Sequence, residues 1–205
     1  LILYWLLPSV RARQVWLLVF SYLFYAAWLP AHALVMLGMT LSDYFIGLYI
    51  HKQSDARKRK VALVCGVGID LLAILIFKNA LGAFAHWIIP VGLSFYALQG
   101  MAYLIDVHRR TLEAEPDFVN YALYVAFFPQ LVAGPITRAK DMLGQFKQRT
   151  YLRDVQWESA AQEFLLGYMK KAYCADYLGQ IVVEPTFRHL SAASAQGILL
   201  AVLSF

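Results

Sequence analysis

The chain has 205 residues, of which 60% are hydrophobic and only 15% are charged. Soluble domains are about 45–50% apolar and about 25% charged, so one of this size could not bury so many apolar side chains. The same composition excludes a disordered chain. The formal charge of +5 comes from short basic tracts between apolar runs, a pattern typical of membrane proteins rather than of nucleic-acid binding. We therefore expect an all-α, polytopic integral membrane protein whose main surroundings are a lipid bilayer, with no nucleic-acid partner.

Two apolar segments come first, at residues 14–29 and 32–50. The second is followed by residues 51–60, which carry five lysines and arginines. Cytoplasmic loops of membrane proteins hold such excesses of positive charge, so we place this tract in the cytoplasm. Two crossings then put Arg11 and Arg13, which precede the first segment, on the same side.

Residues 61–77 are predicted to cross outward and residues 87–107 to return. The return places residues 108–110, which include two arginines, back in the cytoplasm, as the distribution of basic residues requires. Asp106 and Arg110 are one helical turn apart, so we expect them to form an ion pair.

Residues 118–136 are also apolar enough to cross, but basic residues follow them on what would then be the outer side: Arg138, Lys140, Lys147, Arg149 and Arg153. Pro129, Gly134 and Pro135 should break a helix in the middle of this segment or at its end. Broken backbone at membrane depth is tolerated where protein or a water-filled cavity covers it. We therefore predict a re-entrant segment that enters and returns by one face.

Residues 155–183 are predicted to form an amphipathic helix, because apolar residues recur at helical spacing: Trp157, Ala161, Phe164, Leu165, Tyr168 and Ala172. Lys170, Lys171 and Asp176 make a full crossing costly. We expect this helix to lie along the membrane interface or on the cytoplasmic face.

Two carboxylates, Asp43 and Asp70, fall inside apolar segments. They could form an ion or proton site, or they could be polar anchors that tie helices together, with Thr40 as a hydroxyl neighbour of Asp43; we favour the anchors. The only cysteines, Cys65 and Cys174, form no CxxC pair, so we expect no metal site or disulfide framework and read both as small buried apolar residues.

Phosphate-loop, dinucleotide-binding and nucleophile-elbow motifs are absent from the sequence. The carboxylates and the re-entrant segment leave a transporter or channel subunit open, and a noncatalytic membrane scaffold is a third possibility. Transporters are commonly built from inverted repeats with paired broken helices. We find one broken segment and no repeat, which disfavours that class.

Three stretches carry a resemblance to a known family. The first is PVGLSFYALQ at residues 90–99, continuing as YLIDVHR at 103–109. The second is FFPQLVAGPI at 127–136, followed by Arg138, and the third is Gly167 with Lys170-Lys171 and Ala175-Asp176. SYLFY at 21–25 with Trp28 adds to them. Together they resemble the membrane-bound O-acyltransferases, most closely the alginate O-acetyltransferase branch, which is itself similar to the D-alanyl transferases of teichoic acid modification.

The resemblance implies a ring of membrane helices that moves an acyl group to a hydroxyl across the bacterial inner membrane. It implies a catalytic histidine in a Trp/Arg-rich motif that none of the five histidines here matches. Because residues 1–7 and 195–205 are too short to cross, we expect residues 1–205 to be the N-terminal part of one such domain, cut at both ends, with no catalytic residue of its own.

The expected acceptor is alginate, with cellulose, peptidoglycan or teichoic acid as alternatives. The expected donor is acetyl-CoA or another acyl thioester on the cytoplasmic side, with no bound metal or organic cofactor and with periplasmic acetylation proteins as partners. We expect five residues to line the channel or donor path: Tyr96, Gln99, Asp106, Gln130 and Arg138. Arg138 could equally be an interfacial residue whose charge reaches out to water.

Overall fold

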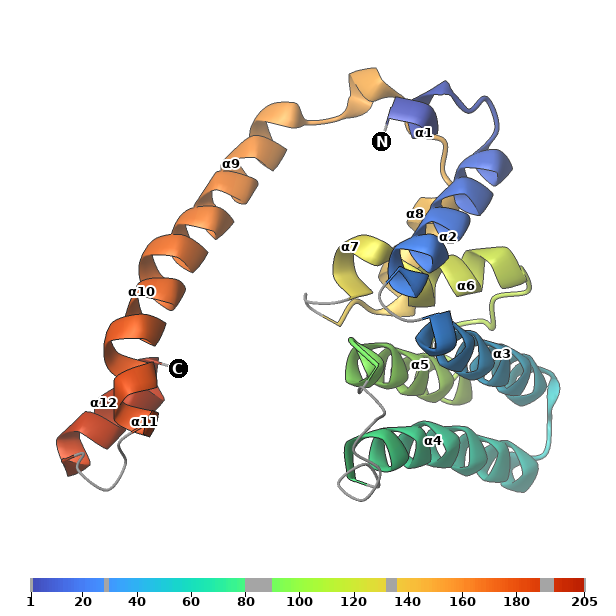
Figure 1. The fold of residues 1–205 in the computed structure, drawn as a ribbon. Coiled ribbons are helices and arrows are strands. Elements are labelled where there is room, and N and C mark those ends of the chain that lie inside the picture. The colour runs from blue at the N-terminus through green and yellow to red at the C-terminus, as the bar shows by residue number, and fades with distance from the viewer. Residues whose placement is uncertain (1, 28–29, 80–89, 132–135, 189–193, 205) are drawn as a thin grey trace. The chain divides into compact units, whose positions relative to one another are not determined.

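A computed structural model describes every residue except 1, 28–29, 80–89, 132–135, 189–193 and 205. The described residues form helices and contain no β-strand, which confirms the all-α prediction. The chain divides into two compact units, Leu1–Arg149 and Thr150–Phe205, and Figure 1 shows the helices of each.

In the part of the first unit that the structure describes, the short helix α1 is followed by seven further helices. Their bounds are α1 Ile2–Leu6, α2 Val10–Ala26, α3 Pro30–Lys52, α4 Ala56–Asn79, α5 Leu93–His108, α6 Phe118–Ala126, α7 Phe128–Leu131 and α8 Ala139–Lys147.

The second unit is also helical, with two π-helical stretches. It contains a 3₁₀ turn at Leu152–Asp154, α9 Trp157–Met169, a π-helix at Lys170–Ala175, α10 Asp176–Leu178, a π-helix at Gly179–Val183, α11 Glu184–Arg188 and α12 Ala195–Ser204.

Among the described residues, two helices are long and apolar enough to cross a membrane: α3 at Pro30–Lys52 and the part of α4 at Ala56–Phe77. A crossing takes roughly 20 residues, whereas α2 has 17 and α5 has 16. The predicted segment at 14–29 ends with Trp28 and Leu29, which lie outside the described residues. The predicted segment at 87–107 begins with residues 87–89, which also lie outside them.

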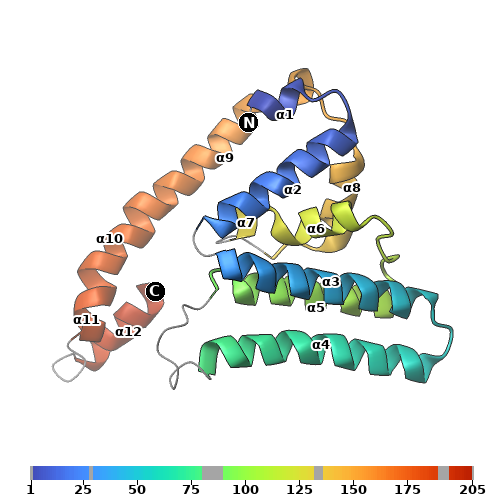
Figure 2. The same ribbon diagram turned by 45° about the vertical axis from the view of Figure 1, so that its right-hand side comes forward.

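Helices α3, α4 and α5 each pack against the other two, and α4 runs antiparallel to the others (Figure 2). We call this group of three helices the α3–α5 layer. Glycines allow the close approach. A Cβ added at Gly47 of α3 would come within 2.6 Å of the Tyr103 ring, and one at Gly66 of α4 within 2.5 Å of Leu104. Small residues at helix interfaces let backbones approach closely, which strengthens van der Waals packing in lipid.

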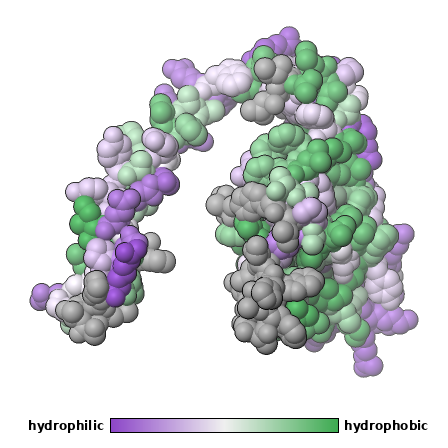
Figure 3. Space-filling view, in the orientation of Figure 1, coloured by the Kyte–Doolittle hydropathy of each residue, from purple (hydrophilic) through white to green (hydrophobic). Residues whose placement is uncertain are grey.

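The basic tracts meet at one end of this layer. Arg110 donates hydrogen bonds to the carbonyls of His51 (2.8 Å) and Gln53 (3.1 Å), at the end of α3. Arg59, at the start of α4, donates to the carbonyl of His108. The structure thus brings residues 51–60 and 108–110 to one end, as the topology prediction requires, and Figure 3 shows hydrophilic residues at this edge of the unit.

The predicted ion pair between Asp106 and Arg110 is wrong. Arg110 has a φ of 62° and lies beyond the end of α5. It has therefore left the helical path on which the two residues would be one turn apart, and its guanidinium bonds across to α3 instead. The backbone carbonyl of Asp106 accepts a hydrogen bond from the Thr111 hydroxyl at 3.0 Å.

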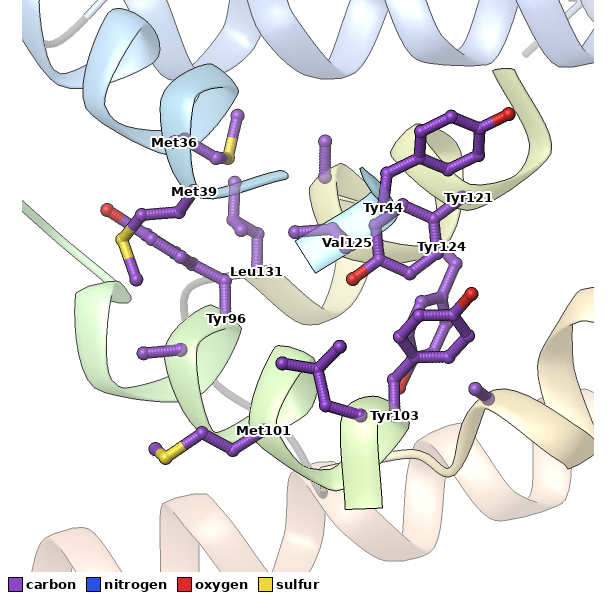
Figure 4. Packing of buried hydrophobic residues seen from close by; sticks show 14 of the residues in the cluster. Met36, Met39, Tyr44, Tyr96, Met101, Tyr103, Tyr121, Tyr124, Val125 and Leu131 are labelled. Carbon is purple, nitrogen blue, oxygen red and sulfur yellow. The ribbon is translucent and has the colours of Figure 1, made fainter. Parts of the chain in front are cut away.

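Tyrosine and methionine side chains pack together with aliphatic ones in the core of the first unit (Figure 4). Met36 and Met39 of α3 pack near Tyr96 of α5, and Tyr103 of α5 packs against Tyr121 of α6 with ring centroids 4.6 Å apart. These side chains are nearly or fully buried. The core therefore joins α6 to the α3–α5 layer.

The outward face of α4 is apolar and exposed, with Val61, Val64, Leu71, Leu72 and Leu75 on it. Cys65 lies exposed on the same helix, and Cys174 is exposed in the second unit. The prediction that both cysteines are buried is wrong. For Cys65 the reason is that an apolar side chain on a membrane helix can face lipid as well as protein.

Gly92 gives the sharpest test of the packing between α5 and the segment that follows α6. Its φ is +75°, and a Cβ there would come within 2.2 Å of the carbonyl oxygen of Leu131. We expect Gly92→Ala to lower the thermal unfolding temperature of the purified protein, because the left-handed backbone alone costs about 1–2 kcal/mol and the overlap adds to it.

Gly144→Ala is the matched control, because nothing lies within 4 Å of a Cβ added at Gly144 in α8. It should be neutral or stabilising by up to about 1 kcal/mol. Equal unfolding temperatures for Gly92→Ala and the wild type would contradict the contact with Leu131.

Candidate functional site

The segment predicted to be re-entrant contains a broken helix. Helix α6 has nine residues, about 14 Å at 1.5 Å per residue. It ends at Ala126, and the next residue, Phe127, has a ψ of 105°. Pro129 then lies in the first turn of α7. A straight helix through Pro129 would set its ring against the carbonyl of Val125, so the chain leaves the helical path before it. The predicted break is confirmed, whereas Gly134 and Pro135 lie outside the described residues.

Neighbouring elements supply partners for the broken backbone. The amide of Phe128 donates to the hydroxyl of Ser21 in α2 at 3.3 Å. The Tyr124 hydroxyl donates to the carbonyl of Thr137 at 3.1 Å, and the Thr137 hydroxyl donates to Oε1 of Gln130 at 3.2 Å. Protein therefore covers this break, which is the condition that a re-entrant segment would have to meet.

The same segment touches both ends of the α3–α5 layer. Leu131 of this segment lies against Gly92 at the start of α5. Its first turn begins at Asp117, which pairs with Arg11, and α8 ends at Lys147, whose Nζ lies 2.7 Å from Oε2 of Glu115. Both of those contacts involve the link between α5 and α6, at the end where α5 finishes.

Around Glu115 the link forms a polar hub, which we define as Glu115, Asn120, Lys147 and Gln14. Asn120 Nδ2 donates to Oε2 of Glu115 at 2.9 Å and to the carbonyl of Leu143 at 3.2 Å. Gln14 Nε2 donates to Oδ1 of Asn120 at 3.3 Å. The hub therefore joins α2, α6 and α8 at the basic end of the unit.

Sequence reasoning missed this hub. It treated residues 113–117 only as a polar link and gave no role to Asn120, the one asparagine in the apolar segment 118–136. That isolated amide was the available signal. A fully buried polar side chain in an apolar helix needs hydrogen-bond partners, and Asn120 is 0% exposed.

The three candidate residues on α5 have different surroundings. Tyr96 is buried edge-on against the ring of Tyr25 in α2, with centroids 6.4 Å apart. Gln99 is buried and donates to the carbonyl of Tyr124 in α6 at 3.1 Å. Asp106 is half-buried near the basic end. Tyr96 and Gln99 therefore join helices in this unit.

The two candidates beyond α6 differ from each other. Gln130 is half-buried and bonds to Thr137, and its amide lies 3.3 Å from the sulfur of Met142. Arg138 is exposed at the start of α8. One hydrogen-bonded route, through Tyr124 and Thr137, connects Gln99 to Gln130. A role for these residues in a donor path stays a prediction.

Asp43 and Asp70, far apart in the sequence, meet beside Gly100 of α5. Both are almost fully buried. Thr40, the expected partner of Asp43, donates its hydroxyl to the carbonyl of Met36 instead, at 2.7 Å. The pair therefore lies inside the protein as predicted, but without that hydroxyl partner.

The predicted helix at 155–183 is present as a run of α- and π-helical turns. Its apolar stripe is exposed, and Phe164 stacks on Tyr168 with centroids 6.4 Å apart. Lys171 lies 2.6 Å from the carboxylate of Asp176, which raises the pKa of Lys171 through this hydrogen bond. The location of the helix at a membrane surface stays a prediction.

Comparison with characterised proteins identifies relatives along most of the chain. It is 35% identical over 193 residues to the probable alginate O-acetylase AlgI of Pseudomonas putida, an alignment that covers 85% of this chain and 40% of the relative. The probable alginate O-acetylase AlgI of Pseudomonas aeruginosa is 34% identical, with 85% and 37% covered. The peptidoglycan O-acetyltransferase of Helicobacter pylori is 29% identical, with 80% and 38% covered.

These relatives confirm the resemblance to the alginate O-acetyltransferase branch. The chain spans about two fifths of the length of the curated relatives that it matches. No family model matches the chain, and no solved structure does so either.

The hub predicts that two lysines of α8 contribute unequally to the free energy of unfolding. We expect Lys147→Met to lower the free energy of unfolding by about 1–3 kcal/mol, because the Glu115 carboxylate, only 3% exposed, loses its cation. Lys140→Met, at an exposed position of the same helix, should change it by less than about 0.5 kcal/mol. Chemical denaturation of the purified protein measures both, and equal effects would argue against the hub.

Proposed function

We propose that this chain, homologous to the alginate O-acetylases over most of its length, is the N-terminal part of a membrane O-acetyltransferase domain. The whole protein would transfer acetyl groups to hydroxyls of an exported polysaccharide. The supporting observation is 34–35% identity to alginate O-acetylases along 85% of the chain. The same relatives disfavour a transporter or a noncatalytic scaffold.

Alginate is the acceptor that we favour. The relatives named alginate O-acetylase are 34 to 35% identical to this chain, whereas the one named peptidoglycan O-acetyltransferase is 29% identical. Peptidoglycan is therefore the first alternative. Cellulose and teichoic acid follow it.

The reaction needs a base and a route through the bilayer. A histidine elsewhere in the whole protein would take the proton of the acceptor hydroxyl, whose oxygen then attacks the acyl carbonyl of the donor. A thioester donor such as acetyl-CoA comes from the cytoplasm, while the polymer lies outside. The broken α6–α7 segment is suited to form one wall of that route, with Gln99 and Gln130 as polar lining.

We propose a multi-pass location in the bacterial inner membrane with the basic end of the first unit in the cytoplasm. Helices α3 and α4 are apolar enough to cross. Contacts at that end join Arg59 to His108, Arg11 to Asp117 and Lys147 to Glu115. This clustering supports a re-entrant segment, because α6 begins and α8 ends where the positive charge gathers.

The function is tested by gene deletion in the bacterium that carries this protein. We expect the acetyl content of one exported polymer to fall to background and to return with the whole gene. In the whole protein, replacement of the histidine expected in a Trp/Arg-rich membrane motif should abolish acetylation and leave membrane insertion intact. Residues 1–205 alone should not restore it. Unchanged acetylation of every envelope polymer after deletion would refute an acetyltransferase, and activity of residues 1–205 would refute the location of the base.

The re-entrant segment is tested by cysteine labelling in intact cells. Cys65 and Cys174 are first replaced by serine, because both are exposed, and single cysteines are then placed at positions 140 and 147. We expect a membrane-impermeant maleimide to label both only after the cells are opened. Position 58 in the basic tract is the cytoplasmic reference. Labelling of 140 and 147 in intact cells would show that residues 118–136 cross the membrane.

A further inference from the structure

Two carboxylates meet in the middle of the α3–α5 layer. Asp43 comes from α3 and Asp70 from α4, and they are 2% and 0% exposed. A Cβ added at Gly100 of α5 would lie 2.1 Å from Oδ2 of Asp43 and 3.6 Å from Oδ2 of Asp70. The two oxygens are therefore within about 6 Å of each other. Only a glycine at position 100 leaves room for them.

No hydrogen-bond donor satisfies this pair among the described residues. Oδ1 of Asp43 and both carboxylate oxygens of Asp70 are buried without a partner. The arginines and lysines on α3 and α4 lie near the helix ends, at Lys52, at residues 57–60 and at Lys78, and Arg109 and Arg110 follow the end of α5. The pair thus has neither a cation nor a donor.

The titratable groups near the pair are tyrosines. Tyr103 of α5 and Tyr121 and Tyr124 of α6 lie close enough to interact electrostatically with Asp43, and Tyr121 with Asp70 as well. The Tyr103 hydroxyl accepts from the amide of Glu115, and that of Tyr124 donates to Thr137. The Tyr121 hydroxyl is fully buried with no hydrogen-bond partner. It is a third unsatisfied polar group at the same place.

Two unpaired anions cannot both persist here. An isolated ionised carboxylate in an apolar interior costs so much that the group neutralises instead, and carboxylates that share a site do not ionise together. An arrangement that leaves both charged would destabilise the layer that α3, α4 and α5 build. The pair needs a positive charge, which a single proton supplies.

We propose that Asp43 and Asp70 form a proton-binding site in the membrane layer and share one proton. The protonated carboxyl then donates a hydrogen bond to the other carboxylate, and the pair carries one negative charge in place of two. The site is separate from the base of the proposed acetyl transfer. It is formed by three helices, so the bound proton contributes to their packing.

A metal ion fits the pair less well. The described residues contain no group of three histidine, cysteine, aspartate or glutamate side chains that could hold a metal. Hard cations such as Ca²⁺ and Mg²⁺ take six or more oxygen ligands. The carboxylates and the Tyr121 hydroxyl supply fewer than that, whereas a proton needs only the two carboxylates.

Infrared spectroscopy of the purified whole protein tests the site without relying on acetyl transfer. We expect the wild type at neutral pH to show the C=O stretch of a protonated carboxyl. Either Asp43→Asn or Asp70→Asn should remove this band, because the amide replaces the protonated carboxyl as donor to the remaining carboxylate. Asp141→Asn, at an exposed position of α8, is the control and should leave the band in place.

Thermal unfolding gives the second measurement. Raising the pH removes the shared proton and leaves two anions, so the unfolding temperature of the wild type should fall more steeply with pH than that of either Asn variant. A wild-type spectrum without the protonated band, or a band that persists in both Asn variants, would overturn the proposal. So would Na⁺ or K⁺ that abolishes the band and stabilises only the wild type, because the ligand would then be a cation.

Discussion

The first unit depends on the requirement that polar groups removed from water find partners within the protein. The Glu115 carboxylate meets that requirement at one end of the layer, where Lys147 and Asn120 reach it from α8 and α6. Gln14 extends the same network into α2. Because these contacts hold the beginning of α6 and the end of α8 at one place, the chain between them must go out and come back. The broken helix follows from that geometry together with Pro129.

The middle of the unit and its opposite end are set by packing of small residues. Gly92 admits the carbonyl of Leu131, and Gly100 admits the carboxylate of Asp43. In a bilayer, an apolar side chain gains little free energy when it moves from lipid into the protein interior. Close packing and buried polar contacts therefore decide which helices associate. The tyrosine-rich core between α5 and α6 adds large contact areas to these sites. The first unit thus contains both the polar hub and an unsatisfied carboxylate pair.

These features bear on the proposed chemistry. Acyl transfer between a cytoplasmic donor and an external polymer needs a protein wall that stays folded at membrane depth. The route from Gln99 through Tyr124 and Thr137 to Gln130 supplies polar groups along the broken segment. Those groups are bonded to one another here, so they would have to exchange partners to contact a donor. Tyr96, in contrast, serves the packing against α2.

The sequence alone determined the class of the protein and most of its helices. Composition required a membrane protein, the basic tracts predicted which loops share a side, and Pro129 predicted a break. These features are local, since they depend on hydropathy, charge and backbone restriction along a short stretch. The motif at 90–99 is also a short local stretch, and it indicated the resemblance to the O-acyltransferases.

The tertiary structure decided which residues meet. No spacing rule relates Asp43 to Asp70, or Glu115 to Lys147, because their proximity depends on how separate helices pack. The same reason explains the errors over Cys65 and over the Asp106–Arg110 pair: periodicity cannot distinguish a lipid-facing side from a protein-facing one, nor foresee that the chain leaves a helix before Arg110. Local physics fixed the elements, and long-range packing fixed the partners.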